Sequence, residues 1–535
     1  MPETSAVLVD ISETHAAMEA QVNAVLERAR WASQVYQRYD RETTMAIADS
    51  VARVAHAKAG EYAEWAVRET GFGVVEHKKL KNEISSLGLV DYYRDWDFVN
   101  PRIDEERKIV ELPRPAGVVF ALAPSTNPIA TVYFKVLSAL MTRNAVVFTP
   151  HPAARDCCID AVDTLAAAAV EAGAPDGIIQ VVRNPTVPLI EEFMASGKTN
   201  VILATGGTAM VRAAYSSSNP AIGVGPGNAP AFVDTTADLK QAAQSLIESK
   251  SFDNSILCTN ESVVITLEEV DANLRRALTN AGAHICSKEE TDALRRFLFH
   301  ARGSNVEAIG RDASWIAQQA GFRINPRATV LVAPIDKIGV DENLSREKLC
   351  PVLGYYVASS KTQAIAQARG LLKMAGGGHS AAIHSTDPQT TMDFAAAVES
   401  YRVVVNAPCS QGAAGFATNL PPSFTIGTGF FGRSSIGENI GPQHLLHWTR
   451  IAYNSASTEV MGDFTTARLS HQGPLVTAPA DGVSGYGGER LTTSQPARPH
   501  TGGRSTGSPS SGSEVSRDEI RKIIAEELRA ALKAQ

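Results

Sequence analysis

The sequence lacks the features that mark several classes of protein. It has no apolar run long enough to span a bilayer and no basic segment followed by an apolar one at its start, so we expect neither a transmembrane helix nor a signal peptide. It has no excess of positive charge, since its formal net charge is -7, and we expect no nucleic-acid or membrane partner. What remains is a chain of 535 residues, which is long enough for two main domains with appendages.

Cysteine is scarce and lacks the spacings of metal sites. None of the six cysteines forms a C-x-x-C pair, and none is spaced with histidines as in a zinc finger, so we expect reduced thiols and no metal. One of them, Cys258, stands in "SFDNSILCTNES", directly after a polar turn. A free cysteine is often a small buried hydrophobic residue. Only its neighbours can therefore show whether Cys258 is a nucleophile.

Helical and strand patterns alternate along most of the chain. Helical spacing of apolar residues dominates residues 13–83, and uniformly apolar segments then alternate with helical ones from "PAGVVFALAP" to "TAMVRAAYSSS". Such strands predict a parallel sheet covered on both faces, so the fold class is α/β. A second α/β region follows at about residues 231–424. Ligands bind parallel sheets at the carboxyl ends of strands, which makes "APSTNP", "TPHPAA" and "ATGGTA" candidate binding loops.

The C-terminal residues change in character. Residues 471–514 are rich in Gly, Ser, Thr and Pro, which predicts a flexible linker. Residues 515–535 carry a capping box and an Ile/Leu stripe opposite charges, which predicts an amphipathic helix. This helix could pack on the body of the protein, lie on a membrane or bind a partner groove. The long linker favours a dedicated partner, and the absence of an aromatic anchor weighs against a membrane.

Three interpretations compete for Cys258: a core residue, the nucleophile of a hydrolase, and the nucleophile of an aldehyde oxidation. In the last, the thiolate adds to the carbonyl, hydride leaves to a nicotinamide, and a thioester remains on the enzyme. That route needs a nucleotide-binding sheet, a donor for the oxyanion and an acceptor for the acyl group. The sheet predicted before Cys258 fits the third interpretation and is unnecessary for the second.

Five motifs follow one another along the chain: "PSTNPIATVYFKVLSALMTRNAVVFTPHPAA", "ATGGTAMV", "SFDNSILCTNE", "EKLCPVLGYY" and "GGGHSAAIHS". With these motifs the chain resembles the aldehyde dehydrogenase superfamily, and specifically its coenzyme-A-acylating branch, from about residue 15 to 455. The resemblance implies a fold with a Rossmann-like nucleotide-binding domain, an α/β catalytic domain and a small oligomerisation arm.

The resemblance also implies domain boundaries. The N-terminal helices and nucleotide-binding domain would span 1–230, completed by about 425–455, and the catalytic domain 231–424. A return segment and the arm would follow in 425–470. Segments near 100–112 and 440–455 are the candidates for an arm that pairs protomers into a dimer or tetramer.

Roles for individual residues also come from the resemblance. Cys258 would be the nucleophile, in a polar site that lowers the pKa of its thiol, and Asn127 would donate its side-chain amide to the oxyanion. Glu347 would contact the nicotinamide ribose, and His379 could deprotonate coenzyme A or lie near its phosphates. The expected cofactor-binding residues are Thr149, His151, Pro152, Gly206, Gly207, Thr208, Val224, Gly225, Glu347 and Pro351. Asn127 also has a plain structural interpretation, as an Asn-Pro turn that starts a helix.

Val224 marks a departure from the hydrolytic relatives. These carry a glutamate-led "E-L-G-G-K-x-P" where this chain has "VGPGNAP", and that glutamate activates the water that cleaves the thioester. Valine cannot accept a proton, so the acyl-enzyme should persist until coenzyme A attacks it. We therefore expect an NAD-dependent, acylating oxidation of a short-chain aldehyde, propionaldehyde or acetaldehyde.

Several alternatives stay open. The chain could be a hydrolytic aldehyde dehydrogenase that releases the free acid, or an acylating enzyme for another aldehyde such as sulfoacetaldehyde or succinate semialdehyde. NADP could replace NAD, because Arg155, which is close in sequence to His151, would suit a 2′-phosphate. The chain could also be a scaffold or cargo adaptor with decayed activity, although that should have eroded the loop around Cys258.

The predicted C-terminal helix on its linker is similar to the encapsulation peptides that direct enzymes into bacterial microcompartments. Acyl-CoA-forming aldehyde dehydrogenases are common cargo there, because the shell retains volatile, toxic aldehydes. The resemblance implies that residues 515–535 contact the shell or other cargo. We expect the protein in the lumen of a microcompartment or in the cytoplasm.

Overall fold

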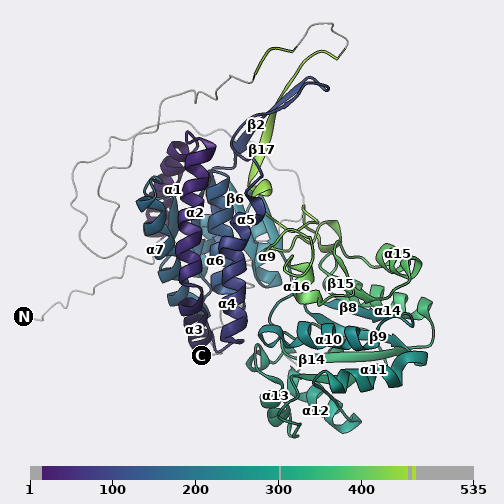
Figure 1. Cartoon of the computed structure of the whole chain (residues 1–535). Helices are drawn as coiled ribbons and strands as arrows, with labels where there is room; N and C mark the ends of the chain where they lie inside the picture. Colours follow the sequence, from purple (N-terminus) through teal and green to yellow (C-terminus); the bar gives the residue numbers. More distant parts are fainter. Residues whose placement is uncertain (1–14, 301–302, 456–460, 465–535) are drawn as a thin grey trace, which may run out of the picture.

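Helices open the described chain, which comprises residues 15–300, 303–455 and 461–464 of a computed structural model (Figure 1). They are α1 (His15–Tyr36), α2 (Arg41–Ala57), α3 (Ala59–Thr70), α4 (Val75–Glu83) and α5 (Leu89–Tyr93), and a π-helical turn (Ile84–Gly88) joins the last two. Apolar residues at helical spacing bury one side of α1, including Val22, Val25 and Leu26. The helical pattern predicted for residues 13–83 is confirmed from His15 onward.

A five-stranded parallel sheet follows, in the order β5-β4-β3-β6-β7. Its strands are β3 (Val118–Leu122), β4 (Ala145–Thr149), β5 (Ile179–Val181), β6 (Val201–Thr205) and β7 (Ala221–Val224), connected by α6 (Pro128–Met141), α7 (Arg155–Glu171), α8 (Val187–Ala195) and α9 (Thr208–Tyr215). Strands β3 and β4 are buried at every residue, as expected for strands covered on both faces. The strand order reverses at β3, between β4 and β6. Such a switch point opens a crevice at the carboxyl ends of the strands.

A second, seven-stranded sheet has the order β10-β13-β14-β9-β8-β15-β16, and its strands are also parallel. They are β8 (Ala229–Val233), β9 (Glu261–Leu267), β10 (Ala283–Ile285), β13 (Val330–Pro334), β14 (Val352–Ala358), β15 (Ala381–His384) and β16 (Val403–Val405). The helices are α10 (Leu239–Ser251), α11 (Glu268–Asn280), α12 (Lys288–Leu298), α13 (Ala313–Ala320), α14 (Lys361–Met374), α15 (Pro388–Ala397) and α16 (Cys409–Ala413), and a small ladder joins β11 (Phe299–His300) to β12 (Gly303–Ser304). The chain changes sheet between Val224 and Ala229. The predicted α/β fold class is confirmed.

A three-stranded antiparallel sheet projects from the body of the molecule (Figure 1). It consists of β1 (Arg102–Asp104), β2 (Ile109–Pro115) and β17 (Leu446–Ala452). β17 pairs with β2 from Leu446 opposite Pro115 to Ala452 opposite Ile109, so segments more than 300 residues apart in sequence lie side by side. The two segments named as candidates for the arm thus form one sheet. Its contact with a second copy of the chain stays a prediction.

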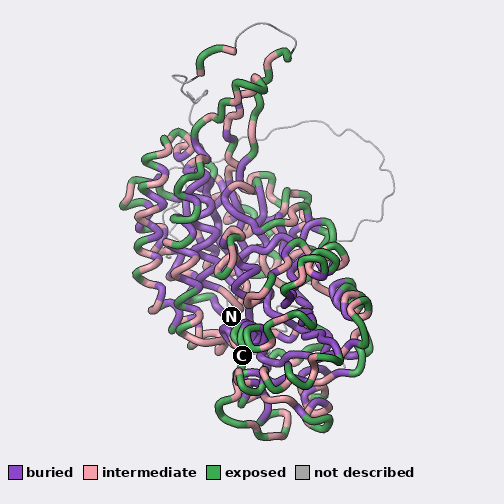
Figure 2. The backbone as a smooth tube through the Cα atoms, turned by 45° about the vertical axis from the view of Figure 1, so that its right-hand side comes forward, coloured by how far each residue is buried: buried purple, intermediate pink, exposed green. Residues whose placement is uncertain are grey.

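The return segment after α16 rejoins the first half of the molecule. Short 3-10 helices at Phe430–Gly432 and Pro442–Leu445 lie in it. Phe424, Ile440 and Leu445 are buried in the same apolar core as the first sheet and the N-terminal helices. Buried backbone runs through the centre of both halves, and exposed backbone covers the outer helices and the projecting sheet (Figure 2). The return segment also contacts the second sheet, because Arg402, the residue before β16, donates to the carbonyls of Gly427 and Gly437.

Two predictions fall outside the described residues. The linker at 471–514 and the amphipathic helix at 515–535 both lie there, so they stay predictions. Within the part of the chain that is described, every helix is too short or too polar to cross a membrane.

Candidate active site

A cavity of about 340 Å³ lies where the carboxyl ends of the first sheet meet the loop that carries Cys258. Ten of the residues predicted for the site line it: Asn127, Thr149, His151, Pro152, Gly206, Gly207, Val224, Gly225, Cys258 and Glu347. They come from the loops after β3, β4, β6 and β7 and from two loops of the second sheet. The loops at the switch point of the first sheet and the loop that carries the candidate nucleophile thus line the same cavity.

Cys258 follows a turn with an uncommon backbone. Three successive residues, Asp253, Asn254 and Ser255, have positive φ angles of 49°, 50° and 65°, a conformation that side chains other than glycine seldom adopt. Side-chain hydrogen bonds hold the turn: Asn254 Nδ2 donates to the Gly310 carbonyl at 2.9 Å, and Ser255 Oγ donates to Asn260 Oδ1 at 2.7 Å. The structure therefore fixes the direction from which the chain enters the cavity at Cys258.

Gly227 brings the "VGPGNAP" segment against this loop. A Cβ atom on Gly227 would clash with the carbonyl oxygen of Cys258, so the close approach requires glycine. The Gly227 amide donates to Glu347 Oε1 at 3.1 Å, which anchors the carboxylate beside the cavity. The segment between β7 and β8 is thus a tight turn at the site, and a strand rather than a helix follows it.

The thiol of Cys258 is not activated in the way expected. Cys258 faces the cavity, but burial of its thiol raises its pKa to about 12, and the Glu347 carboxylate adds to the rise. A backbone hydrogen bond and, after it, the positive charges of Arg402 and Lys81 lower the pKa, each by less than burial raises it. The expectation of a lowered thiol pKa was wrong for this structure, because desolvation of the thiolate exceeds the favourable charges.

Replacing Glu347 with glutamine should make Cys258 more reactive. Removing the negative charge lowers the thiol pKa, so a larger fraction is thiolate wherever the wild-type Glu347 is ionised, which is above its own pKa of about 7. We expect iodoacetamide to alkylate Cys258 about two- to tenfold faster at pH 7.5, with the rate rising with pH in both proteins. Glu307→Gln, at an exposed glutamate that does not line the cavity, is the matched control. An unchanged rate in Glu347→Gln would show that the carboxylate does not act on the thiol.

The loops of the first sheet contribute His151, Gly206 and Gly207 to the cavity wall. Burial lowers the pKa of His151 to about 4, so its ring is neutral, and its Nδ1 accepts a hydrogen bond from the Ala153 amide at 3.1 Å. Gly206 and Gly207 leave the turn before α9 without Cβ atoms at the cavity wall, and no side chain caps the N-terminus of that helix. Free backbone amides at a helix N-terminus suit a phosphate.

Three of the predicted site residues do not line the cavity. Thr208 is exposed at the first turn of α9, and Pro351 is buried with its carbonyl bonded to the Leu331 amide at 2.8 Å. His379 is fully buried, its Nδ1 lies 3.1 Å from Ser380 Oγ, and burial lowers its pKa to about 3. The structure therefore gives His379 neither access to the cavity nor the basicity to deprotonate coenzyme A.

Comparison with known proteins shows the family of the chain. A profile described as "Aldehyde dehydrogenase family" matches residues 2–296. An acetylating succinate-semialdehyde dehydrogenase of Clostridium kluyveri is 32% identical over 83% of this chain and 98% of its own length. The chain belongs to the aldehyde dehydrogenase family.

Other matches within the aldehyde dehydrogenase family differ in length and setting. The aldehyde-alcohol dehydrogenase of Clostridium acetobutylicum is 37% identical over 79% of this chain, but the match covers only 49% of that protein, so this chain spans about half of its length. An acetylating aldehyde dehydrogenase from Geobacillus thermoglucosidasius superposes with a TM-score of 0.81 and 35% identity over 83% of this chain and 98% of that one. A propionaldehyde dehydrogenase from the Clostridium phytofermentans fucose utilisation bacterial microcompartment superposes with a TM-score of 0.74 and 28% identity, over 81% and 97%.

Sequence analysis did not predict the buried residues that contact the cavity-lining residues without lining the cavity themselves. Lys78, Lys81 and Asp253 form a buried group of charges next to Asn127. In "EHKKLKNE" the two lysines look like the solvated face of a helix, and no local signal marks them as buried. The apolar wall was missed for the same reason, since it is assembled from residues far apart in sequence: Phe72, Ile190, Met210, Leu349, Phe424 and Ile426.

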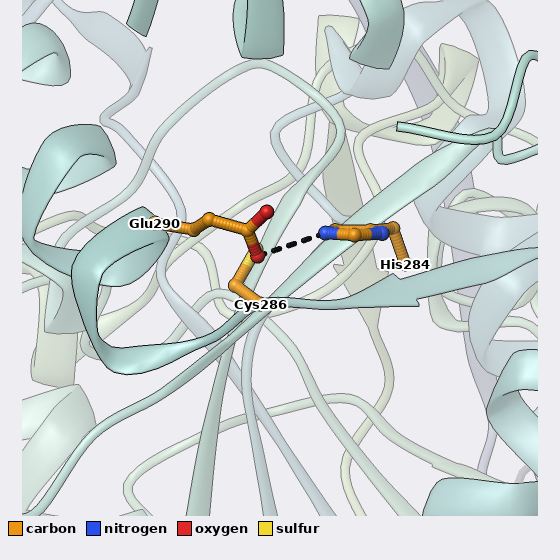
Figure 3. Close-up of side chains that lie close together, drawn as sticks. All are labelled: His284, Cys286 and Glu290. Atoms are coloured by element: carbon orange, nitrogen blue, oxygen red, sulfur yellow. Dashed lines mark hydrogen bonds and ion pairs between the residues drawn. The ribbon is translucent and has the colours of Figure 1, made fainter. Parts of the chain in front are cut away.

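A further group of metal-ligating types lies away from the cavity. The ligand atoms of His284, Cys286 and Glu290 lie within 4.8 Å of one another (Figure 3). Protein contacts account for the arrangement: His284 Nε2 lies 2.9 Å from Glu290 Oε2, the Ser287 amide donates to the same oxygen at 2.8 Å, and Cys286 packs in an apolar core. Glu290 belongs to the capping box of α12. We assign the group to the helix cap.

Proposed function

We propose that the chain oxidises a short-chain, uncharged aldehyde to its acyl-CoA, with NAD⁺ as hydride acceptor and coenzyme A as acyl acceptor. The observation that carries this proposal is that Cys258, Asn127 and Val224 line one cavity at the nucleotide-binding end of the first sheet. The balanced reaction is aldehyde + CoA-SH + NAD⁺ → acyl-CoA + NADH + H⁺.

Cys258 begins the reaction after its thiol has released its proton to solvent: the thiolate adds to the aldehyde carbon, the carbonyl electron pair moves to the oxygen, and the anion of a thiohemiacetal forms. The Asn127 amide stabilises the oxygen that becomes negative. Collapse of this adduct re-forms the carbonyl, expels hydride and leaves a thioester on Cys258; the nicotinamide ring of NAD⁺ supplies the hydride acceptor when bound. The coenzyme A thiol then attacks the thioester carbon, and the Cys258 sulfur leaves as thiolate.

Val224 supports coenzyme A rather than water as the acyl acceptor. It is buried at the end of β7 and lines the cavity where hydrolytic relatives carry the water-activating glutamate. Burial raises the pKa of Glu347 to about 7, so a second carboxylate at the cavity could in principle accept a proton from water. Hydrolysis through Glu347 is the alternative that the experiment below distinguishes.

The charge of the cavity supports an uncharged aldehyde and NAD. Among the described residues that line it, no lysine or arginine is present to pair with the carboxylate of succinate semialdehyde or the sulfonate of sulfoacetaldehyde. Arg155, the candidate partner for the 2′-phosphate of NADP, is outside the lining and donates to Asp156 Oδ1 at 2.8 Å. The relative from the Clostridium phytofermentans microcompartment is named as a propionaldehyde dehydrogenase. Propionaldehyde carries no charge, so it needs no lysine or arginine in the lining.

A microcompartment setting is the second part of the proposal. The similarity to that microcompartment enzyme supports it, as does the sequence of residues 515–535. We propose that this segment binds the shell or other cargo. A chain that ends at residue 514 should keep its turnover but fail to sediment with shells.

The first experiment measures NADH formation from propionaldehyde with and without coenzyme A. Turnover should require coenzyme A and stop after a burst of one NADH per site in its absence. Succinate semialdehyde should give a kcat/KM at least about tenfold lower, because its carboxylate loses hydration without gaining a partner. Equal, sustained turnover without coenzyme A would contradict the acylating mechanism. If that turnover without coenzyme A were lost in Glu347→Gln, Glu347 would be identified as the base that activates water.

A further inference from the structure

A buried group of charges lies directly behind Asn127. Lys78 and Lys81 project from α4, and their side chains are 3% and 1% exposed. Both ammonium groups contact Asp253 Oδ2, whose side chain is fully buried. Burying charge is unfavourable unless each group is paired and hydrogen-bonded. The three charges meet this condition by pairing with one another, next to the cavity-lining residue Asn127.

The same aspartate fixes the turn that leads to Cys258. Asp253 Oδ1 accepts a hydrogen bond from the Val74 amide at 2.7 Å, and the Asp253 amide donates to His77 Nδ1 at 2.9 Å. Asp253 is also the first of the three residues with positive φ before the nucleophile. Helix α4 is therefore bonded both to the nucleophile loop and, through Lys81, to the oxyanion donor.

Lys81 makes one contact that Lys78 does not. Its Nζ donates to Asn127 Oδ1 at 2.5 Å, whereas Lys78 Nζ donates to the Thr126 carbonyl at 3.1 Å. Asn127 Nδ2 donates to Thr126 Oγ1 at 3.2 Å with one of its two hydrogens. Lys81 is not among the residues that line the cavity, so it can act on the reaction in two ways: through Asn127, or through its positive charge, which lowers the pKa of the Cys258 thiol.

The orientation of an asparagine amide depends on its partners, because its oxygen and nitrogen ends have nearly the same shape. An ammonium group can only donate, so the end of Asn127 that faces Lys81 must be the oxygen. The opposite orientation would set two donors against each other and turn the carbonyl oxygen toward the developing negative charge of the substrate.

From this geometry we infer that Lys81 is a positioning residue, which holds the Asn127 amide with Nδ2 available to the oxyanion. The inference rests on the proposed aldehyde oxidation and adds a residue to its mechanism. Lys81 acts on Asn127 and not on substrate, so its removal should weaken the transition state more than the binding of aldehyde.

The test compares Lys81→Met with Lys78→Met in the full chain. Both substitutions remove one ammonium group from the same Asp253, and only the first frees the Asn127 amide. We expect Lys81→Met to lower the rate of the NADH burst about 10- to 100-fold with KM changed less than about threefold, and Lys78→Met to change both by less than about threefold. Equal losses in the two variants would overturn the inference. Lys81→Arg, which keeps the charge and the donors, should recover part of the rate and covers the case in which Lys81→Met fails to fold.

A double-mutant cycle with Asn127→Ala tests the route of the effect. If Lys81 acts through Asn127, Lys81→Met should have little further effect in the Asn127→Ala background. An undiminished further loss, together with slower alkylation of Cys258, would mean that Lys81 acts on the thiol instead, and would overturn the inference. The burst precedes acyl transfer, so it reports on Lys81 even if water proves to be the acceptor; wild-type protein that forms no NADH from any aldehyde would instead refute the proposed function.

Discussion

Replacing Cys258 with alanine should reduce NADH formation from propionaldehyde by about 1,000-fold or more, because Cys258 is the one cysteine among the described residues that line the cavity, and the thioester cannot form without its thiol. Cys258 is partly exposed and lines the cavity together with the loops at the carboxyl ends of the first sheet. The measurement is the burst of NADH on mixing with aldehyde and NAD⁺, followed by mass spectrometry of the protein without coenzyme A. Wild-type protein should carry one acyl group on Cys258, and the variant should carry none.

The control for this experiment is Cys286→Ala. Cys286 is buried in the core of the second sheet and does not line the cavity. It should keep the burst and the acyl group, and both variants should retain the far-ultraviolet circular dichroism of the wild type. An acyl group that persists in Cys258→Ala would place the nucleophile elsewhere. A retained burst without any acyl group would show that the thioester is not an intermediate.

The fold was predictable from sequence because its strands are covered on both faces. Uniformly apolar strands such as β3 and β4 cannot belong to a half-exposed sheet, so their alternation with helices indicates parallel α/β structure. The loops of the first sheet that line the cavity followed from the same rule, since loops at the carboxyl ends of neighbouring strands meet at one edge. Strand order in the second sheet was not predictable, because β14 lies between β13 and β9 through contacts that no local pattern encodes.

Burial explains most of what the sequence did not predict at the site. Whether a thiol near charged groups is activated depends on the balance of desolvation and charge, and at Cys258 desolvation prevails. His379 stands in a glycine-rich segment that looks exposed, yet its side chain is enclosed and its carbonyl is bound by Arg402. Lys81 is bonded to an aspartate 172 residues away in sequence, a pairing that only the folded chain creates.

Replacing Asn127 with alanine should lower kcat about 100- to 1,000-fold and leave KM for the aldehyde within a few-fold, because the amide bonds more strongly to the developing oxyanion than to the neutral carbonyl. Asn127 is the residue before α6, and its side chain reaches the cavity while its backbone carbonyl accepts the first hydrogen bond of the helix, from the Thr131 amide at 3.1 Å. Steady-state kinetics with propionaldehyde, NAD⁺ and coenzyme A measures both parameters.

The backbone hydrogen bond at the start of α6 makes it possible to separate a catalytic role of the Asn127 side chain from a structural one. The backbone bond from Thr131 survives in Asn127→Ala, so α6 should form as before, and the melting temperature should change little compared with the loss of rate. Iodoacetamide should alkylate Cys258 at the wild-type rate, because no contact with Asn127 is among the influences on the thiol pKa. A loss of rate matched by slower alkylation or by a large fall in stability would mean that Asn127 acts by shaping the loop. A loss of kcat with the thiol and the fold unchanged would leave oxyanion stabilisation as its role, since the amide then affects only the state in which the substrate oxygen is charged.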